Sequence, residues 1–454
     1  MPSLVIPLAS RIPPDFPAKW IIGWLLLPNI VIVLMWQIAG KPMQAFILIS
    51  GIAALVLAQV RSRAIRTIGA LGIFVTISIF YVARFFGIPP LNLAVVAQFI
   101  TEVRPLRSPE YAAAGAVMAV FAVVIWRITP SVERFHSRTQ YLYAAVAIGL
   151  FAMLDASFSQ AKGVGLQPPA IGEKVDSAVK QVGLTPAAVQ GRSVLVILVE
   201  ALGKPVTSPE REIFNADWNR THWNSRYTVQ TGSNHFAGST TFGELRELCD
   251  TTTPYDNFDF AKADCLPGRF AKAGYETTAI HSFAANFFDR TTWYPKTGLH
   301  NLEFDDELRA AGVKACQGIF PGRCDVDVGK VIHKRLTQSD KPQFIYWLTL
   351  NTHAPVIADE TLGTQRCTLG TEQWRYGFPV VCRMFEAHHA LADSIDRLVM
   401  APDLPQVDIL IVGDHRPPLF DRAASARFSQ DRVPWIYLRA RDRAKPANAQ
   451  LRSL

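Results

Sequence analysis

Acidic and histidine side chains stand directly after two apolar runs of the sequence. Glu200 follows the run 193–199, and the pair Asp414 and His415 follows the run 408–412 after one glycine. Taken singly, the glutamate could be a helix-cap partner or a surface residue, and the Asp–His pair could be ordinary loop polarity. Taken together, two carboxylates and an imidazole form a donor set that suits Zn²⁺ or Mn²⁺. We therefore expect one divalent cation at this place.

Hydroxyl side chains follow Gly238 where a helix is expected to begin, namely Ser239, Thr240 and Thr241. A helix start presents free N–H groups and the positive end of the helix dipole, which favour an anion. A hydroxyl bound there to a divalent cation would be pushed towards an alkoxide at neutral pH, and so could act as a nucleophile. The alternative is a plain helix N-cap with Glu244 as its capping-box partner. The motif alone leaves both readings open.

Continuous apolar runs of the C-terminal half are typical of strands buried on both faces of a sheet. They alternate with helical patterns, which indicates an α/β domain with a mainly parallel sheet. The expected strands are 193–199, 344–350, 408–412 and a weaker one at 277–280, and the expected helices are 240–249, 266–274, 325–337 and 383–400.

Each expected strand ends in polar side chains. His281 follows the strand 277–280, and Asn351 and His353 follow the strand 344–350. Ligands of such sheets bind outside the carboxyl ends of the strands. We therefore expect these residues to share one site with Glu200 and the Asp–His pair.

The composition is too apolar for an ordinary soluble enzyme, with 49% hydrophobic and 19% charged residues and a mean hydropathy of +0.15. The charge is unevenly placed. Residues 1–160 carry 12 Lys and Arg against 5 Asp and Glu, and the remainder carries 34 against 33. The net charge of +8 therefore belongs to the apolar half, and nucleic-acid binding is not expected.

Five apolar stretches of the N-terminal half are long enough, or nearly so, to cross a bilayer, which takes about 20 residues at helical rise. Arg84 near the end of the third stretch is expected to snorkel to the interface. A cleavable signal peptide is not expected, because the first stretch is too long and four more follow it. Asp155 is expected at a span end. The spans show no chain of buried carboxylates or histidines that would form an ion path, so a transporter is not expected. The stretches are 20–39, 43–60, 67–87, 110–128 and 140–156.

Basic residues gather on one side of these spans, in the loops 61–66 and 127–138 and before the first span. The positive-inside rule then makes the N-terminus cytoplasmic, and five spans place everything after about residue 157 outside. We expect a membrane domain at 1–157, a juxtamembrane linker at 158–192 with a short helix around 174–182, and an exported catalytic domain at 193–454.

All six cysteines lie in the part expected outside, as an oxidising compartment permits. Six cysteines allow 15 connectivities, and nearness in sequence suggests that neighbours pair. No Cys-x-x-Cys spacing favours a metal cluster. The expected disulfides are Cys249–Cys265, Cys316–Cys324 and Cys367–Cys382.

Five short motifs occur in the order seen in one branch of the alkaline-phosphatase/sulfatase superfamily. That branch includes lipoteichoic acid synthase, lipid A phosphoethanolamine transferases and the phosphoglycerol transferases of periplasmic glucans, and the chain also resembles them in its spans, linker and exported domain. The late segment 433–438 looks like the edge strand of the superfamily. The motifs are Val-Glu200-Ala-Leu-Gly, Gly-Ser-Thr240-Thr-Phe-Gly-Glu, Asn-Phe-Phe-Asp-Arg290, Asn-Thr-His353 and Gly-Asp414-His415.

The resemblance implies that Thr240 is the nucleophile and a metal ligand, with Glu200, Asp414 and His415 completing the metal's ligands. Because hydroxyls flank Thr240 on both sides, the assignment could slip by one residue.

The resemblance also implies residues on the substrate side of the site. Arg290 looks like the residue that clamps the phosphate, which suits the paired donors of a guanidinium. His353 would protonate the leaving oxygen or hold the incoming acceptor. His281 is a third substrate-binding candidate, with a satisfied histidine after a strand as the alternative.

The implied activity is transfer of a phosphoethanolamine or phosphoglycerol head group from a membrane phospholipid to a glycan or lipid A acceptor, through a phosphothreonine. The implied place is the inner membrane of a bacterium, with the catalytic domain in the periplasm. No Cys or Ser followed by Pro and Arg comes after Gly238, which argues against a formylglycine sulfatase. The alternatives are a membrane-tethered phosphodiesterase and a non-catalytic scaffold. The sequence leaves the head group, the acceptor, the metal and the oligomeric state open.

Overall fold

Seven strands form one mixed, mainly parallel sheet in the C-terminal part of the chain, seen in a computed structural model that describes residues 13, 15–36, 41–86, 93–160, 166, 169–170 and 172–441. The strand order is β2-β9-β8-β1-β7-β3-β4. Strands β8, β1, β7, β3 and β4 are parallel, whereas β9 runs antiparallel to β8 and β2 antiparallel to β9. The bounds are β1 Ser193–Val199, β2 Tyr227–His235, β3 Glu276–His281, β4 Asn301–Glu303, β7 Gln343–Leu348, β8 Val407–Gly413 and β9 Arg432–Ala440.

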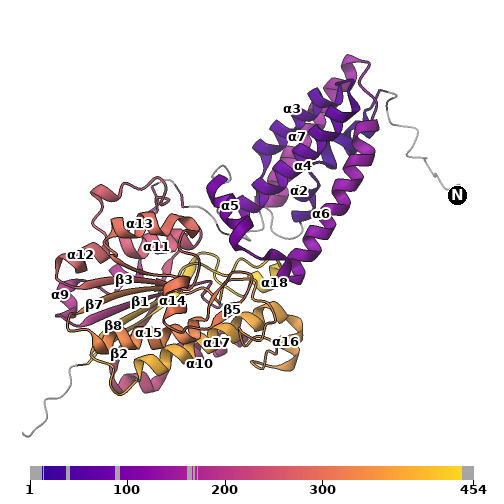
Figure 1. The fold of residues 1–454 in the computed structure, drawn as a ribbon. Coiled ribbons are helices and arrows are strands. Elements are labelled where there is room, and N and C mark those ends of the chain that lie inside the picture. The colour runs from indigo at the N-terminus through magenta and orange to yellow at the C-terminus, as the bar shows by residue number, and fades with distance from the viewer. Residues whose placement is uncertain are drawn as a thin grey trace, which may run out of the picture. The chain divides into compact units, whose positions relative to one another are not determined.

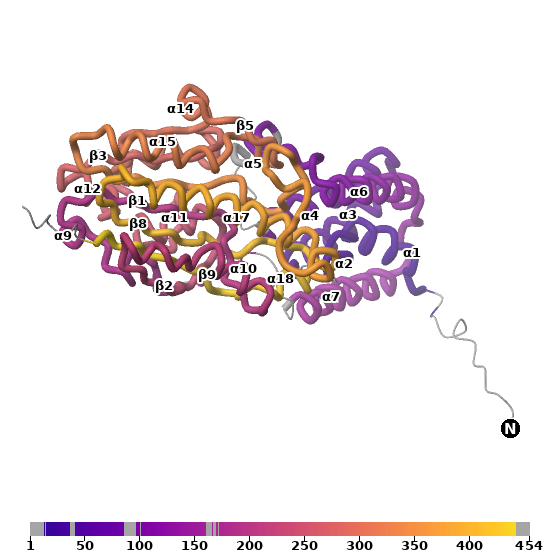
Figure 2. Tube along the Cα trace, turned by 90° about the horizontal axis from the view of Figure 1, so that it is seen from below, coloured from indigo at the N-terminus to yellow at the C-terminus, as the bar shows by residue number. Residues whose placement is uncertain are grey.

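Helices cover both faces of this sheet (Figure 1). On one face Val194, Val196 and Leu198 of β1 pack with side chains of α8, α11, α12 and α13. On the other face Leu195 and Ile197 pack with α15 and α17, which run along the strands on the near side of the sheet in Figure 2. The bounds are α8 Ala178–Gln181, α9 Pro186–Val189, α10 Ser208–Trp218, α11 Thr240–Cys249, α12 Leu266–Lys272, α13 Arg290–Thr297, α14 Asp305–Ala310, α15 Asp325–Gln338, α16 Glu372–Gly377, α17 Pro379–Val399 and α18 Arg422–Ser425.

The α/β architecture and the four expected strands of this part are confirmed, because runs buried on both faces carry a clear sequence signal. The segment 433–438 was expected at the sheet edge, and that expectation is wrong. β9 lies between β8 and β2, and β2 forms the edge. β2 is half exposed and rich in polar residues, so it lacks the apolar run that reveals the other strands. In the expected linker, the helix around 174–182 is the shorter α8.

The three expected disulfides are present, and none of the six cysteines is free. Cys316–Cys324 closes the small hairpin of β5 (Ala315–Gln317) and β6 (Pro321–Arg323).

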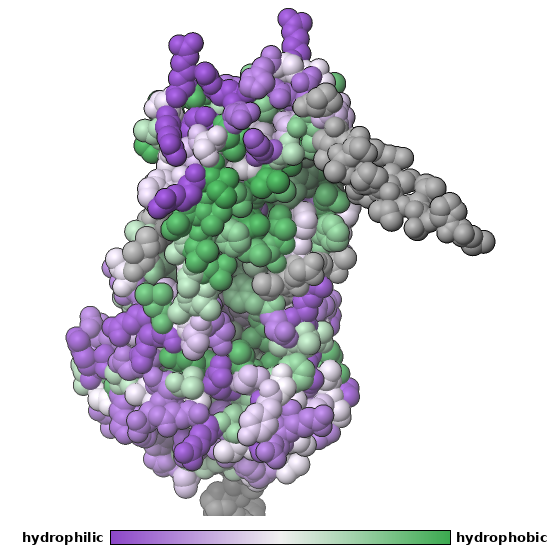
Figure 3. Space-filling view, turned by 90° about the vertical axis from the view of Figure 1, so that its right-hand side faces the viewer, coloured by the Kyte–Doolittle hydropathy of each residue, from purple (hydrophilic) through white to green (hydrophobic). Residues whose placement is uncertain are grey.

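The N-terminal part is a helical unit in which three helices are long and apolar enough to cross a membrane: α4 (Arg63–Phe86), α6 (Pro109–Ile128) and α7 (Arg138–Gln160). α3 (Gln44–Ala58) is shorter, and the first expected span is interrupted by a turn at Pro28 between η2 (Ile21–Leu26) and α2 (Ile30–Met35). Five full-length spans are therefore not seen among the described residues, and the ends of the first and third expected spans lie outside them. Figure 3 shows hydrophobic surface gathered on this unit.

Asp155 does not lie at the end of its helix, because α7 continues to Gln160. Its side chain is buried inside the helical unit. The indole N–H of Trp36, the backbone N–H of Met43 and the hydroxyl of Ser159 donate hydrogen bonds to its carboxylate at 2.9, 2.6 and 2.9 Å. A buried carboxylate with three donors is satisfied, so it serves the packing of these helices.

Residues 93–108 pack with the C-terminal α/β unit, although they lie in sequence between α4 and α6. They contain α5 (Leu93–Glu102) and the short helix η3 (Pro105–Arg107). No helix was predicted for this segment, because its apolar part is too short to span a bilayer.

Candidate metal centre and active site

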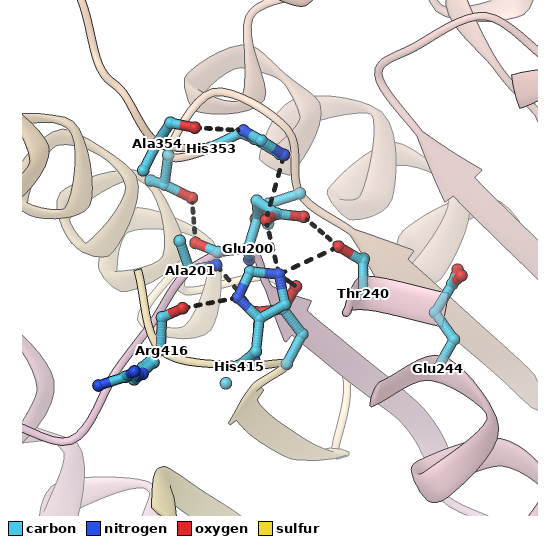
Figure 4. A network of polar contacts seen from close by, with 12 residues as sticks. Glu200, Ala201, Thr240, Glu244, His353, Ala354, His415 and Arg416 are labelled. Atoms are coloured by element: carbon cyan, nitrogen blue, oxygen red, sulfur yellow. Dashed lines mark hydrogen bonds and ion pairs between the residues drawn. The ribbon is translucent and has the colours of Figure 1, made fainter. Parts of the chain in front are cut away.

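The carboxyl ends of two neighbouring parallel strands bring the acidic residues together. Val199 of β1 is paired with Gly413 of β8, so Glu200 and Asp414 leave the sheet side by side. His415 Nε2 lies 3.3 Å from Glu200 Oε1 and 3.2 Å from Asp414 Oδ2. All three side chains are buried. Strand register therefore builds the three-residue cluster that the sequence predicted (Figure 4).

Thr240 is the first residue of α11, and its hydroxyl points into this cluster (Figure 4). Thr240 Oγ1 lies 3.0 Å from Glu200 Oε2 and 3.3 Å from His415 Nε2. The capping-box reading of the motif is wrong, because Ser239 occupies the N-cap position without a side-chain cap and the Glu244 carboxylate pairs with Arg290 instead. Thr240 is thus a hydroxyl at a helix start that faces two carboxylates and an imidazole.

The unsatisfied oxygens of the cluster fit a divalent cation. Glu200 Oε1 and Asp414 Oδ2 are buried oxygens without a hydrogen-bond donor among the described residues. Buried polar atoms normally have partners, so such a pair needs an explanation. His415 donates its Nδ1–H to the carbonyl of Arg416 at 2.8 Å, which leaves Nε2 towards the carboxylates as a ligand atom. This donor set is the one a borderline divalent cation prefers.

The charges in the cluster shift its pKa values strongly. Burial alone would raise the pKa of Glu200, but His353 and His415 outweigh it and lower that pKa to about 2. Burial and the charge of Glu200 raise the pKa of Asp414 to about 8. Burial would lower the pKa of His415, but Asp414 and Glu200 raise it to about 9. Asp414 and His415 therefore hold protons strongly, and these protons offset the negative charge that a bound cation would otherwise offset.

Three histidines at this edge of the sheet share one tautomer. Like His415, His353 donates its Nδ1–H to a backbone carbonyl, that of Ala354 at 2.8 Å, and His281 does so to Leu348 at 3.0 Å. Each Nε2 is then free of a proton when the ring is neutral. Burial lowers the pKa values of His353 and His281, that of His281 to about 3. His353 Nε2 lies 3.8 Å from Glu200 Oε1, so this imidazole borders the cluster.

Arg290 is the first residue of α13, and its guanidinium is only 2% exposed. Its Nε and one terminal nitrogen each lie 3.2 Å from the Glu244 carboxylate, and the other terminal nitrogen donates to the carbonyl of Phe287 at 3.0 Å. Burial would lower the pKa of Arg290, but Glu244 outweighs it and raises that pKa. After burial, the charge of Arg290 is the next cause that lowers the pKa of His281, so the guanidinium lies near this imidazole and helps to keep it neutral.

The sequence did not reveal the buried network around Glu244. The hydroxyls of Tyr294 and Tyr346 donate to the same carboxylate that holds Arg290. Glu244 stands four residues after Thr240 on one face of α11, and that spacing was the available signal. The network fixes Arg290 against Glu244, which stands one helical turn along α11 from Thr240.

A second unpredicted set holds the backbone around Glu200. Thr349 Oγ1 accepts a hydrogen bond from the Glu200 N–H at 2.9 Å, and the hydroxyl of Thr352 donates to the Glu200 carbonyl at 2.7 Å. His388 of α17 contacts the same carbonyl at 3.4 Å. Arg246 donates to the carbonyls of Gly413 and Asp414 at 2.8 and 2.9 Å. Side chains of other elements therefore fix both of the turns that carry the cluster.

A hydroxyl at a helix start, placed against a cluster that could hold a divalent cation, can be activated as a nucleophile, and the helix start favours an anion beside it. The chain belongs to the Sulfatase family, whose model matches residues 194–454.

Comparisons with individual proteins give distant likenesses. A "Putative cyclic beta-1,2-glucan modification protein" of Rhizobium meliloti is 27% identical over 173 residues, which cover 37% of this chain and 25% of that protein. The chain thus spans about a quarter of the length of this curated relative. The lipoteichoic acid synthase LtaP of Listeria monocytogenes is 15% identical with a TM-score of 0.43, over 57% of this chain and 68% of the other. The lipooligosaccharide phosphoethanolamine transferase EptA of Neisseria meningitidis is 14% identical with a TM-score of 0.37, over 95% and 78%.

Proposed function

We propose that the chain is a metal-dependent transferase that moves a phosphoethanolamine or phosphoglycerol head group from a membrane phospholipid to a glycan or lipid A acceptor. The observation that carries the proposal is the position of Thr240 Oγ1, which lies 3.0 Å from Glu200 Oε2 and 3.3 Å from His415 Nε2 at the start of α11. Membership of the Sulfatase family supports a reaction at an ester of phosphate or sulfate.

Glu200, Thr240, Asp414 and His415 would hold the cation, which we propose to be Zn²⁺ or Mn²⁺. When bound, it would make the threonine hydroxyl easier to deprotonate and offset negative charge on the phosphate oxygens. The start of α11 adds free backbone N–H groups and the positive end of a helix dipole, which also favour the phosphate.

The reaction runs in two displacements at phosphorus. In the first, Thr240 Oγ forms a bond to phosphorus, the bond to the diacylglycerol oxygen breaks, and diacylglycerol leaves with a proton. In the second, an acceptor hydroxyl attacks phosphorus and loses its proton, the bond to Thr240 Oγ breaks, the head group leaves on the acceptor, and Thr240 Oγ takes a proton back. His353 Nε2 suits the role of base for the acceptor hydroxyl, because burial keeps its imidazole neutral and its Nδ1–H is engaged with Ala354.

Arg290 and His281 are proposed to hold the phosphate. Three of the five N–H groups of Arg290 donate to Glu244 and Phe287, and we propose that phosphate oxygens take up remaining donor capacity of the guanidinium. His281 would contact the phosphate through its Nε2, in a hydrogen bond whose proton lies between Nε2 and a phosphate oxygen.

The proposed location is the inner membrane of a bacterium, with five spans, a cytoplasmic N-terminus and a periplasmic catalytic domain. The proposed parts are the membrane domain 1–157, the linker 158–192 and the catalytic domain 193–454. Three disulfides in the catalytic unit and three long apolar helices before it support this location. An anchored catalytic domain meets its lipid donor at a raised effective concentration.

Mass spectrometry of the intact protein and of its tryptic peptides, after incubation with phospholipid, tests the proposal. We expect a mass increase on the tryptic peptide 227–246, absent in Thr240→Ala and present in the matched control Ser239→Ala. The size of the increase distinguishes ethanolamine from glycerol, because the two head groups differ in mass. An adduct that remains in Thr240→Ala would overturn Thr240 as the nucleophile.

Addition of a labelled donor and an acceptor glycan distinguishes transfer from hydrolysis. Label on the glycan supports the transferase. Label released only into solution would instead support the membrane-tethered phosphodiesterase, a function that membership of the Sulfatase family also allows.

A further inference from the structure

The segment α5–η3, residues 93–107, packs on the catalytic unit although it lies in sequence between two membrane-spanning helices. It contacts two parts of that unit, the turn Asn286–Asp289 directly before Arg290 and the hairpin β5–β6. Both border the proposed phosphate site, because Arg290 follows the turn and Phe320 of the hairpin lies 4.0 Å from the ring of His353.

The turn before Arg290 has an unfavourable backbone conformation. Phe288 and Asp289 have φ angles of 56° and 54°, in the left-handed region that favours glycine. Non-glycine residues stay in this region only where surrounding contacts impose it. Arg290 depends on the turn, because its guanidinium donates to the carbonyl of Phe287 and lies 5.5 Å above the ring of Phe288.

The side chain of Gln98 in α5 brackets this turn with both ends of its amide. Its Nε2 donates to the carbonyl of Asn286 at 2.9 Å, and its Oε1 accepts from the N–H of Phe288 at 3.0 Å. Phe99 packs beside it, with ring centroids 5.0 Å from Phe287 and 5.9 Å from Phe288. The two residues therefore hold the turn from one side through backbone bonds and aromatic packing.

The end of the segment is attached to the hairpin in the same way. The N–H of Arg104 donates to the carbonyl of Ile319 at 2.8 Å, and its guanidinium donates to Gln317 at 3.2 Å. Arg107 lies 3.2 Å from Asp359 in the loop after His353. These contacts link the segment to the residues that surround the ring of His353.

We propose that Gln98 is a positioning residue, which holds the strained turn so that Arg290 is presented to the phosphate of the substrate. The proposal rests on the phosphate-binding role given to Arg290 above. Gln98 itself acts at a distance, through the backbone of residues 286–288. A segment that belongs to the membrane part in sequence thus completes the phosphate site.

Gln98→Met in the full-length chain tests the proposal. Methionine keeps the length of the side chain, but it cannot donate to the carbonyl of Asn286 or accept from the N–H of Phe288 as the amide does. Thr101→Ala is the matched control, because the exposed Thr101 hydroxyl bonds only to carbonyls of α5 itself among the described contacts. We expect Gln98→Met to speed hydrogen exchange in the peptide 284–292 and to raise KM for a chromogenic phosphodiester about tenfold, with kcat changed less than about twofold. Metal content should stay unchanged, and the control should behave as the wild type.

A double-mutant cycle with Arg290→Lys separates positioning from a general structural effect. If Gln98 acts through Arg290, the loss from Gln98→Met is smaller in the Arg290→Lys background than in the wild type. Unchanged exchange, unchanged KM or fully additive losses would each overturn the proposal. A wild-type chain that cleaves the chromogenic diester but leaves phospholipid intact would remove the proposed donor and not the role of Gln98.

Discussion

Gly243 of α11 lies against Asp414 so closely that no side chain fits between them. A Cβ atom on Gly243 would stand 2.9 Å from the Cβ and 3.0 Å from the Cα of Asp414. The glycine therefore lets the loop that carries two metal-ligand candidates pack directly on the helix that carries Thr240. The distance from the Thr240 hydroxyl to the cluster depends on this contact.

Gly243→Ala should displace Asp414 and weaken the metal centre. The expected loss is about 10- to 100-fold in metal affinity or turnover, the range found when groups supporting a metal ligand are changed. Metal content after dialysis and turnover of a phosphodiester measure it. Gly377→Ala at the end of α16 is the matched control, because nothing lies within 4 Å of a Cβ at that position. Full metal content and turnover in Gly243→Ala would show that the loop yields freely.

The parts of the fold that could be predicted from the sequence are the strands whose residues are buried on both faces of the sheet. β1, β7 and β8 are buried on both faces, so they appear as continuous apolar runs. β2 is half exposed and polar, and it was missed. β9 was placed at the edge by resemblance to the superfamily, whereas β2 is the edge strand. α5 was missed because ten mixed residues resemble neither a membrane span nor a long amphipathic helix.

The candidate site was predicted where residue type and strand position agree, as for Glu200, Asp414 and His415. Pairing across long stretches of chain could not be predicted. Glu244 and Arg290 are 46 residues apart, and the sequence offers each of them many partners of opposite charge. The choice is made by the packing of α11 against α13, which a linear pattern does not contain.

The buried pair of Glu244 and Arg290 predicts a large stability effect. Glu244→Ala leaves the guanidinium buried without its carboxylate, which costs about 3 to 5 kcal/mol. For a domain of this size the apparent melting temperature should fall by about 10 °C. Thermal unfolding of the purified chain in detergent measures the shift. Glu360→Ala removes an exposed carboxylate and should leave the transition where it is. Equal transitions in both variants would contradict a stabilising role for the pair.

Cation binding should displace protons from the cluster. Burial and the charge of Glu200 raise the pKa of Asp414 to about 8, and Asp414 and Glu200, acting against burial, raise that of His415 to about 9. Both groups are therefore protonated in the cation-free protein at pH 7, and a cation must compete with these protons. Its affinity should rise as pH increases from about 6 to 9 and level off above.

Calorimetry in buffers with different ionisation enthalpies counts the protons that Zn²⁺ or Mn²⁺ releases. Asp414→Asn should release one proton fewer, with a flatter dependence of affinity on pH. An affinity that does not change between pH 6 and 9 would contradict the coupling of the two carboxylates with His415.

His388 should make the fold sensitive to acid. Burial lowers its pKa from the ordinary 6.5 to about 4, and the polar contact of the ring with the Glu200 carbonyl offsets this only in part. The unfolded chain therefore binds a proton at a higher pH than the folded chain does. The stability that the neutral ring contributes is complete above pH 6.5 and is lost as pH falls to 4, by at most about 3 kcal/mol.

His388→Gln keeps an N–H donor in place of the imidazole but removes the titration. Melting curves of the full-length chain in detergent between pH 4 and 7.5 should therefore fall less steeply with acid for the variant than for the wild type. His281 adds a similar contribution to both proteins, so the difference between the two curves isolates His388. His222→Gln, which removes an exposed ring, is the control for loss of a histidine as such. If His388→Gln and the wild type lose stability in parallel, the buried ring is not the group that acid protonates.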